Sequence, residues 1–120
     1  MPTILAAEDD PNILISIDFL LTNAGYGVIT AANGEQAWSA LQQHTPDLVV
    51  LDVMLPAIDG LELCRRIRAT STLKAMKVLM LSARGRDGEI QSGLQLGADA
   101  YMTKPFGTRA FLDTVARLLA

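Results

Sequence analysis

Short apolar runs that alternate with longer segments of helical period are the feature that most limits how this chain can fold. The runs are residues 4–7, 27–31, 48–51, 78–81 and 100–102. They lack the polar alternation of a half-exposed strand, which is typical of strands buried on both faces of a parallel sheet. Between the first two runs, Asp10 and Pro11 predict a helix start and Gly25 predicts its end.

The same signals predict helices in each of the remaining segments. The predicted helices span residues 11–24, 33–44, 61–69, 87–96 and 108–120. Strict alternation of strands and helices, joined by right-handed crossovers, predicts an α/β fold: a doubly wound, five-stranded parallel sheet with helices on both faces. No internal repeat, linker or charge run divides the 120 residues. We therefore expect one domain.

Charge and cysteine content exclude several classes of protein. Ten Lys and Arg against 13 Asp and Glu give a net charge of −3, which argues against direct nucleic-acid binding. Cys64, the single cysteine, excludes an internal disulfide and a zinc site and favours a reducing cytoplasm. The acidic Glu8 comes before any signal-peptide core could form, and no apolar stretch reaches the roughly 20 residues of a membrane span. We expect a cytoplasmic protein without membrane association.

Polar side chains follow the predicted strands at the edge where open parallel sheets bind ligands. In chain order they are Glu8, Asp9, Asp10, Asp52, Ser82 and Lys104. Clustered carboxylates repel one another unless a cation lies among them, and oxygen ligands suit Mg²⁺. Asp10 is best interpreted as a helix cap. Glu8, Asp9 and Asp52 together predict a metal site.

Asp52 has a second interpretation beside such a metal. A carboxylate next to Mg²⁺, with a lysine and a hydroxyl nearby, is placed to attack a phosphoryl group. The metal and Lys104 would neutralise the oxygens of the transferred phosphate. The sequence therefore predicts an acyl phosphate on Asp52.

Five segments carry a resemblance to a known family. They are ILAAEDDPN at 4–12, PDLVVLDVMLP at 46–56, DG at 59–60, LSA at 81–83 and GADAYMTKPF at 97–106. In this order, the chain resembles from end to end the receiver (response regulatory) domain of two-component response regulators. The resemblance implies one receiver domain over residues 1–120 with a flavodoxin-like (βα)5 fold.

The resemblance also implies a function for Asp52. It implies that Asp52 accepts a phosphoryl group from a phosphohistidine on a sensor histidine kinase or a histidine phosphotransfer protein. Such a domain catalyses only its own phosphorylation and dephosphorylation and is not otherwise an enzyme. Ser82 and Tyr101 are implied as a switch that alters the surface of the fourth helix, fifth strand and fifth helix. That surface would control an output partner or domain that the sequence does not identify.

A ligand set is implied in the same way. Asp9 would bind Mg²⁺ directly and Glu8 through water, with Asp52 and the main-chain carbonyl of Met54 as further ligands; Mn²⁺ is the alternative cation. Ser82 would hydrogen-bond the phosphoryl oxygens.

Lys104 would pair with the same phosphoryl oxygens. Pro105 matches a proline whose preceding peptide bond is commonly cis. Three residues depart from the family pattern: Glu8 where Asp is usual, Ala57 where Gly is usual and Ser82 where Thr is frequent. Glu8 and Ser82 bear on the reaction rates and the metal affinity more than on membership of the family. Ala57 is expected to alter the mobility of the loop after Asp52.

Helical spacing assigns side chains of two helices. The residues expected to face the sheet from the first helix are Ile13, Ile17, Leu20 and Ala24. Ile15 and Phe19 lie on the opposite face and form a candidate docking patch for the phosphodonor; in the alternative, Phe19 packs on the fifth helix. Arg65, Arg66 and Arg68 of the third helix are interpreted as a solvated face.

Three other functions stay open. A phosphohydrolase of haloacid-dehalogenase type would need a second Asp two residues after Asp52, where Met54 stands. A flavin-binding flavodoxin-like protein would need a phosphate loop after the first strand, where Glu8 and Asp9 would repel phosphate. The third is a receiver-like binding module that acts without phosphorylation.

Overall fold

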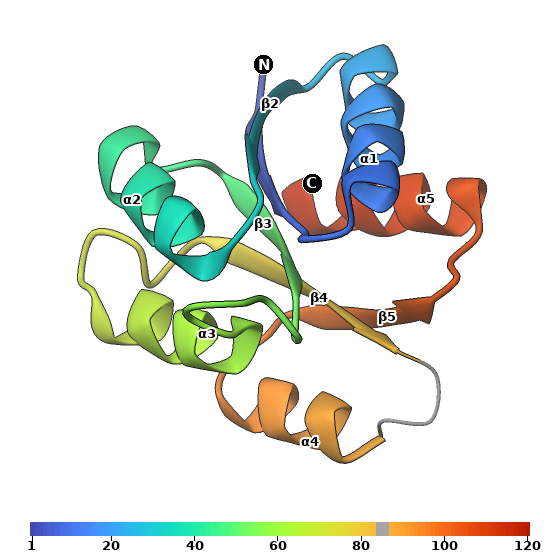
Figure 1. Ribbon diagram of the computed structural model, residues 1–120. Helices are drawn as coiled ribbons and strands as arrows, with labels where there is room; N and C mark the ends of the chain where they lie inside the picture. The colour runs from blue at the N-terminus through green and yellow to red at the C-terminus, as the bar shows by residue number, and fades with distance from the viewer. Residues whose placement is uncertain (84–86) are drawn as a thin grey trace.

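Strands and helices alternate along the chain, as predicted (Figure 1). The computed structural model describes residues 1–83 and 87–120, except for the side chains of residues 87, 89 and 90. The strands are β1 (Thr3–Ala7), β2 (Gly27–Ala31), β3 (Leu48–Asp52), β4 (Lys77–Ala83) and β5 (Ala100–Lys104). The helices are α1 (Pro11–Asn23), α2 (Gly34–His44), α3 (Gly60–Ala69), α4 (Asp87–Gln95) and α5 (Thr108–Leu119).

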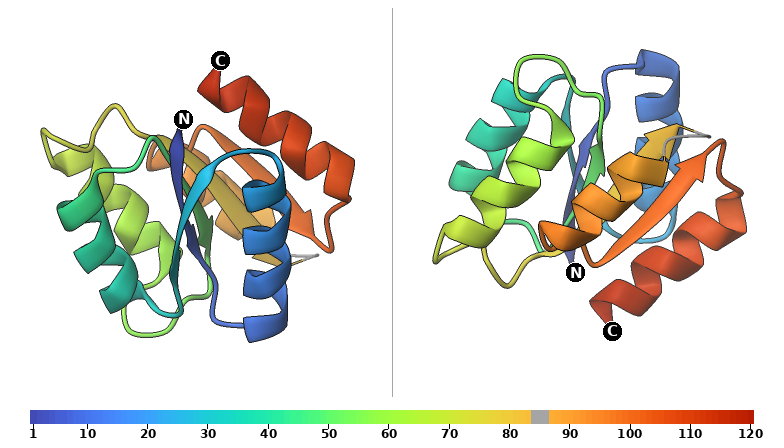
Figure 2. Two further views of the ribbon diagram at one scale, coloured as in Figure 1. Left: turned by 90° about the horizontal axis from the view of Figure 1, so that it is seen from above. Right: turned by 90° about the horizontal axis from the view of Figure 1, so that it is seen from below.

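The strands form one parallel sheet in the order β2-β1-β3-β4-β5. Helices α1 and α5 cover one face, and α2, α3 and α4 cover the other (Figure 2). This arrangement is the predicted doubly wound, flavodoxin-like fold. Among the described residues, none of the helices has the length and apolarity required to cross a lipid bilayer.

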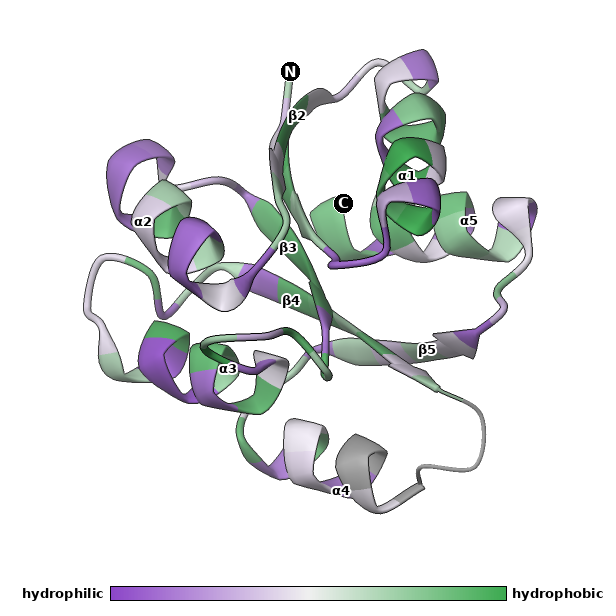
Figure 3. Cartoon of the chain, in the orientation of Figure 1, coloured by the Kyte–Doolittle hydropathy of each residue, from purple (hydrophilic) through white to green (hydrophobic). Residues whose placement is uncertain are grey.

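Burial on both faces explains the continuous apolar runs. Every residue of β3 is buried, as are Ile4 to Ala7 of β1. One set of alternate strand residues packs with Ile17 of α1 and Phe111 of α5, and the other packs with Leu41 of α2 and Leu63 of α3. The hydropathy colouring shows the same pattern, with apolar strands in the centre and polar segments on the outer helices (Figure 3).

β1 and β3 are each one residue longer than predicted, and two strands extend further. β4 continues to Ala83 and β5 to Lys104, two residues beyond the apolar runs that indicated them. Ser82 pairs with Thr103 and Ala83 pairs with Lys104. The backbone ladder does not depend on apolar side chains, so it carries polar residues to the edge of the sheet.

The face of α1 is predicted with one error. Ile17 and Leu21 are fully buried, while Ile13 and Leu20 are partly buried against the same core. Ala24, which was expected to face the sheet, is exposed. The helix ends at Asn23 and Ala24 is its C-cap, so Leu21, one turn after Ile17, takes the inner position.

The interpretation of Arg68 as a solvated residue is wrong. Its guanidinium donates hydrogen bonds to the carbonyls of Lys74 (2.9 Å), Met76 (2.6 Å) and Gly97 (2.9 Å) and pairs with Asp99 at 2.8 Å. Arg68 therefore joins α3 to the segments that precede β4 and β5.

Arg65 and Arg66 fit the solvated interpretation better, because both pair with Glu62 on the same helix, at 2.7 and 2.9 Å. Their hydrogen bonds lower the pKa of Glu62 to about 2, and the bond from Arg65 has the larger effect. Arg66 also lies over the ring of Trp38, 5.5 Å from its centroid.

Ala57 has the left-handed backbone conformation that the glycine usual in the family would adopt without strain. Its φ is 71°, and the Ile58 amide donates to the Pro56 carbonyl across it at 3.0 Å, which makes a γ-turn. We expect Ala57→Gly to raise the free energy of unfolding by about 0.5 kcal/mol, because relief of strain exceeds the extra entropy of the unfolded chain. Urea unfolding of both proteins measures the change.

Ala116→Gly is the matched control for Ala57→Gly. Ala116 is an exposed residue inside α5, where glycine is expected to lower the free energy of unfolding by about 1 kcal/mol. Equal losses of stability in the two variants would contradict the assignment of strain to Ala57.

Candidate functional site

The predicted polar side chains meet at the carboxyl ends of β1, β3 and β5. Glu8 directly follows β1, and Asp52 and Lys104 are the last residues of β3 and β5. Nζ of Lys104 lies 3.0 Å from Oε2 of Glu8 and 3.2 Å from Oδ2 of Asp52. Along their strands, the three side chains point to the sheet face that is covered by α1 and α5. Because they share this face, the Lys104 ammonium contacts both carboxylates.

Glu8 and Asp52 are buried with 1% and 3% of their surface exposed, whereas Asp9 is exposed. One carboxylate oxygen from each of these three residues lies within 4.8 Å of the others. Within the part of the chain that the structure describes, three carboxylates of this cluster face one ammonium, that of Lys104. The excess negative charge and the hard oxygen donors fit a divalent cation such as Mg²⁺.

Burial sets the proton affinity of this cluster. The pKa of Glu8 is raised above its ordinary value of 4.5, mainly because the side chain is buried, with a further increase from the charge of Asp52. The hydrogen bond from Lys104 opposes that increase. Burial disfavours the Lys104 charge, but the hydrogen bond to Glu8 and the charge of Asp52 outweigh it and raise the Lys104 pKa. Lys104 is thus a fixed positive charge beside the carboxylates.

Backbone contacts fix the two chain segments that carry the acids. The side chain of Asp10 accepts from the Asn12 amide at 2.9 Å and caps α1, while the Asp10 amide donates to Glu8 Oε1 at 3.2 Å. The Met54 amide donates to Oδ1 of Asp52 at 3.2 Å, and Met54 as a whole residue is 54% exposed. The main chain of Met54 therefore lies beside the Asp52 carboxylate.

Ser82 and Tyr101 lie on the sheet face covered by α2, α3 and α4. Ser82 pairs with Thr103, two residues after Tyr101 on β5, so all three point to the same side. Ser82 is 1% exposed and its Oγ lies 3.4 Å from the Ala83 carbonyl, whereas Tyr101 is 46% exposed. The serine hydroxyl is therefore buried near the carboxyl end of β4, and the tyrosine is about half exposed.

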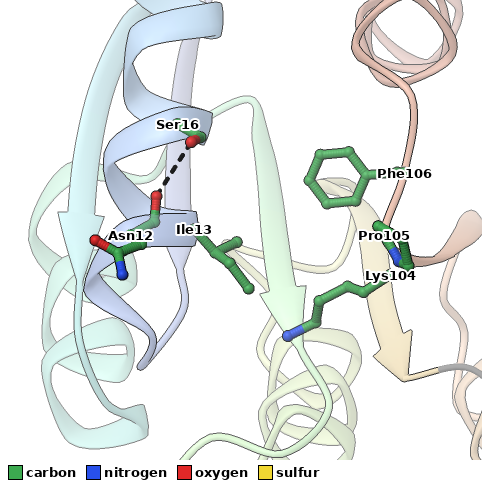
Figure 4. Close-up of a pocket in the computed structure, with 6 residues that line it drawn as sticks. All are labelled: Asn12, Ile13, Ser16, Lys104, Pro105 and Phe106. Atoms are coloured by element: carbon green, nitrogen blue, oxygen red, sulfur yellow. Dashed lines mark hydrogen bonds between the residues drawn. The ribbon is translucent and has the colours of Figure 1, made fainter.

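A cleft beside this cluster escaped the sequence analysis. It has a volume of about 470 Å³ and separates α1 from the segment after β5 (Figure 4). Its lining residues are Asn12, Ile13, Ser16, Lys104, Pro105 and Phe106. The Lys104–Pro105 bond is cis, as the resemblance implied, and Phe106 stacks on Phe111 with ring centroids 5.0 Å apart. Asn12 and Ser16 lie one helical turn apart, directly after the acidic residues 8–10. This pair of polar residues is the sequence feature that could have indicated the cleft.

The outer face of α1 exposes two large apolar residues, as predicted. Ile15 and Phe19 are 67% and 63% exposed. Such exposure contradicts the alternative in which Phe19 packs on α5. The patch and the cleft adjoin the same helix.

Comparison with known proteins gives consistent matches. Residues 4–116 match the family model described as the response regulator receiver domain. The chain is 48% identical over 105 residues to the transcriptional regulatory protein AfsQ1 of Streptomyces coelicolor, a match covering 88% of this chain and 45% of that protein. It is 43% identical to the alkaline phosphatase synthesis transcriptional regulatory protein PhoP of Bacillus subtilis, covering 97% and 48% respectively. The chain spans about half the length of these curated relatives.

Solved structures agree with these matches. A putative response regulator from Chloroflexus aurantiacus superposes with a TM-score of 0.94 at 36% identity, covering 98% of this chain and 97% of that one. The chemotaxis response regulator CheY4 of Vibrio cholerae superposes with a TM-score of 0.93 at 33% identity, covering 99% of both chains.

Proposed function

Because this chain belongs to the receiver-domain family of two-component response regulators, whose members accept phosphoryl groups, we propose that Asp52 is its phosphoacceptor. One observation carries this proposal. Asp52 is buried at the end of the central strand β3, with Lys104 3.2 Å away and two further carboxylates, Glu8 and Asp9, beside it. In this setting the Asp52 carboxylate can act as a nucleophile, because the positive charge of Lys104 and the candidate metal site lie next to it.

In the proposed reaction, a carboxylate oxygen of Asp52 attacks the phosphorus of a phosphohistidine. The new P–O bond forms as the P–N bond breaks, and the electron pair of that bond stays with the imidazole nitrogen. Lys104 pairs with an oxygen of the transferred group, and the Ser82 hydroxyl donates a hydrogen bond to another.

Glu8, Asp9, Asp52 and the Met54 carbonyl would hold Mg²⁺, or Mn²⁺ in its place. The cation supplies positive charge for the phosphoryl oxygens. Apart from this transfer and the later hydrolysis of its own acyl phosphate, we assign no catalytic activity to the chain.

The proposed partners follow from this chemistry. The phosphodonor is a sensor histidine kinase or a histidine phosphotransfer protein. Phosphorylation shifts Ser82 toward the phosphoryl group, and Tyr101 turns inward and remodels the α4, β5 and α5 surface that controls an output partner or domain. We place the chain in the cytoplasm, which suits its buried free Cys64.

Acetyl phosphate tests the proposed function without a protein partner. We expect the intact mass to show one phosphoryl group after incubation with acetyl phosphate and Mg²⁺, and none when a chelator is in excess. Beryllofluoride with Mg²⁺ should bind in place of the phosphoryl group. Failure of both reactions would contradict the proposal. Continuous hydrolysis of a phosphomonoester such as p-nitrophenyl phosphate would instead support a phosphohydrolase.

The α1 patch, Ile15 and Phe19, is proposed as part of the phosphodonor interface. Replacing both residues with serine is expected to slow transfer from a phosphorylated histidine kinase by about tenfold or more, because exposed apolar anchors contribute strongly to binding. The rate with acetyl phosphate should be unchanged. Leu94→Ser is the control, since Leu94 is also exposed (41%) but lies on α4. Equal transfer rates for wild type and the double variant would contradict this assignment.

A further inference from the structure

We propose that Gly34, the first residue of α2, is a positioning residue for the metal site. It does so by holding the β3–α3 loop, residues 53–59, which includes the main chain of Met54. This inference rests on the proposed function, in which the Met54 carbonyl is a metal ligand. The evidence is a close approach between α2 and the loop, made by residues that are distant in the sequence.

The first observation is steric. Gly34 is buried, and a Cβ built on it would lie 2.6 Å from both the carbonyl carbon and the Cβ of Ile58, and closer still to the Ile58 carbonyl oxygen. Two of these three atoms are backbone, so no side-chain rotation makes room. Glycine is the residue that allows α2 and the loop to be this close.

The second observation is a hydrogen bond. The Gly34 amide donates to the Pro56 carbonyl at 2.9 Å. Amides in the first turn of a helix have no acceptor within the helix. Asn33, the N-cap of α2, accepts from Gln36 instead, so a carbonyl of the β3–α3 loop completes the capping of α2.

The loop is held from its other end as well. The Gly60 amide donates to the Val53 carbonyl at 3.0 Å, and a Cβ on Gly60 would lie 2.9 Å from the Cα of Val53. Between these two anchors, Ala57 has a φ of 71°. Strained conformations persist where the surroundings over-determine them. Gly34 supplies that constraint at Pro56 and Ile58, which are two and four residues beyond Met54.

Gly34→Ala would push the Ile58 backbone away from α2 and stretch the bond to Pro56. The displacement would pass through Leu55 to the Met54 carbonyl. The amide of the same residue donates a hydrogen bond to the Asp52 carboxylate. Residues that orient metal ligands typically change metal affinity by about 10–100-fold. We therefore expect the dissociation constant for the divalent cation to rise by about tenfold or more.

Mn²⁺ binding measured by electron paramagnetic resonance tests this, since the signal of free Mn²⁺ gives the dissociation constant without any enzymatic step. The matched control is Gly88→Ala in the first turn of α4, where a Cβ would meet no atom within 4 Å. We expect wild type and Gly88→Ala to bind alike and Gly34→Ala to bind about tenfold more weakly. Equal binding by Gly34→Ala would overturn the inference. A wild type that binds no Mn²⁺ would contradict the proposed function itself.

If Gly34→Ala does not fold, amide hydrogen exchange of the wild-type protein tests whether the contact between Gly34 and the loop is coupled to metal binding. If opening of the Gly34–Pro56 bond and metal binding exclude each other, Mg²⁺ at about ten times its dissociation constant should slow exchange at Gly34 by about tenfold. The Gln36 amide, which donates to Asn33 on the same helix, should change little. Slowing of less than about twofold at Gly34, or the same slowing at Gln36, would overturn the inference.

Discussion

The Asp52→Asn protein is expected to take up no phosphoryl group from acetyl phosphate under conditions that fully modify the wild type. The amide is close to the carboxylate in size but is not a nucleophile, so the rate should fall by more than about 1000-fold. Intact mass and peptide mapping check this result. Asp113→Asn is the control, because Asp113 is an exposed carboxylate on α5 whose side chain is 74% accessible. A phosphoryl group of normal yield on another residue of Asp52→Asn would contradict the assignment.

Loss of folding would not account for such a result. Asp52 raises the pKa of Glu8 through charge repulsion, and Lys104 pairs with both acids. Removing the charge of Asp52 leaves Glu8 and Lys104 as a matched pair. In the presence of a chelator, Asp52→Asn is therefore expected to unfold at the same urea concentration as the wild type or a higher one.

Lys104→Met is expected to lower the free energy of unfolding by about 2 kcal/mol in chelator at neutral pH. Removing one partner of a buried ion pair typically costs about 3–5 kcal/mol, and the 20% exposure of the Lys104 side chain reduces this cost. Glu8 and Asp52 would be left buried without their ammonium. Urea unfolding of both proteins measures the loss, and saturating Mg²⁺ should restore part of it.

The loss in Lys104→Met should also depend on pH. The pKa of Glu8 is already raised, chiefly by burial, and the variant removes the hydrogen bond that opposes the increase. A carboxyl group with a raised pKa stabilises the fold at low pH and loses that contribution as the pH rises through its folded-state value. The deficit relative to wild type should therefore grow from acidic toward neutral pH.

Lys77→Met serves as the control for Lys104→Met. Lys77 is an exposed lysine at the start of β4, so its substitution should change stability by no more than about 0.5 kcal/mol at any pH. A deficit for Lys104→Met that is independent of pH would contradict the role given to Glu8.

The sheet and its helices could be predicted because their signals are local. Buried strands read as continuous apolar runs, and Asp10 caps α1 where its position before Pro11 indicates a helix start. The ends of β4 and β5 could not be predicted in this way, because Ser82 and Thr103 interrupt the apolar runs and these ends are paired through the backbone. Ala24 was placed on the wrong face because helical spacing was continued beyond the last turn.

The candidate site was predictable at the level of the sheet edge. Topology alone implies that Glu8, Asp9, Asp52 and Lys104 converge, and the structure brings them together. Contacts that depend on loop geometry gave no sequence signal. The proximity of Gly34 to Ile58 and the four partners of Arg68 arise from tertiary packing of distant segments, which neither periodicity nor spacing encodes.

The contact between Lys104 and Glu8 joins residues 96 positions apart, which has a consequence for the order of synthesis. On the ribosome, β1 and β3 emerge long before β5, and their pairing already gathers the acidic side chains. Lys104 lies on an edge strand, which pairs only with β4. A nascent chain therefore lacks the contacts of Lys104 with Glu8 and Asp52 until its last strand docks. Docking of β5 completes the hydrogen-bonded sheet and pairs the Lys104 ammonium with the two buried acids in a single step.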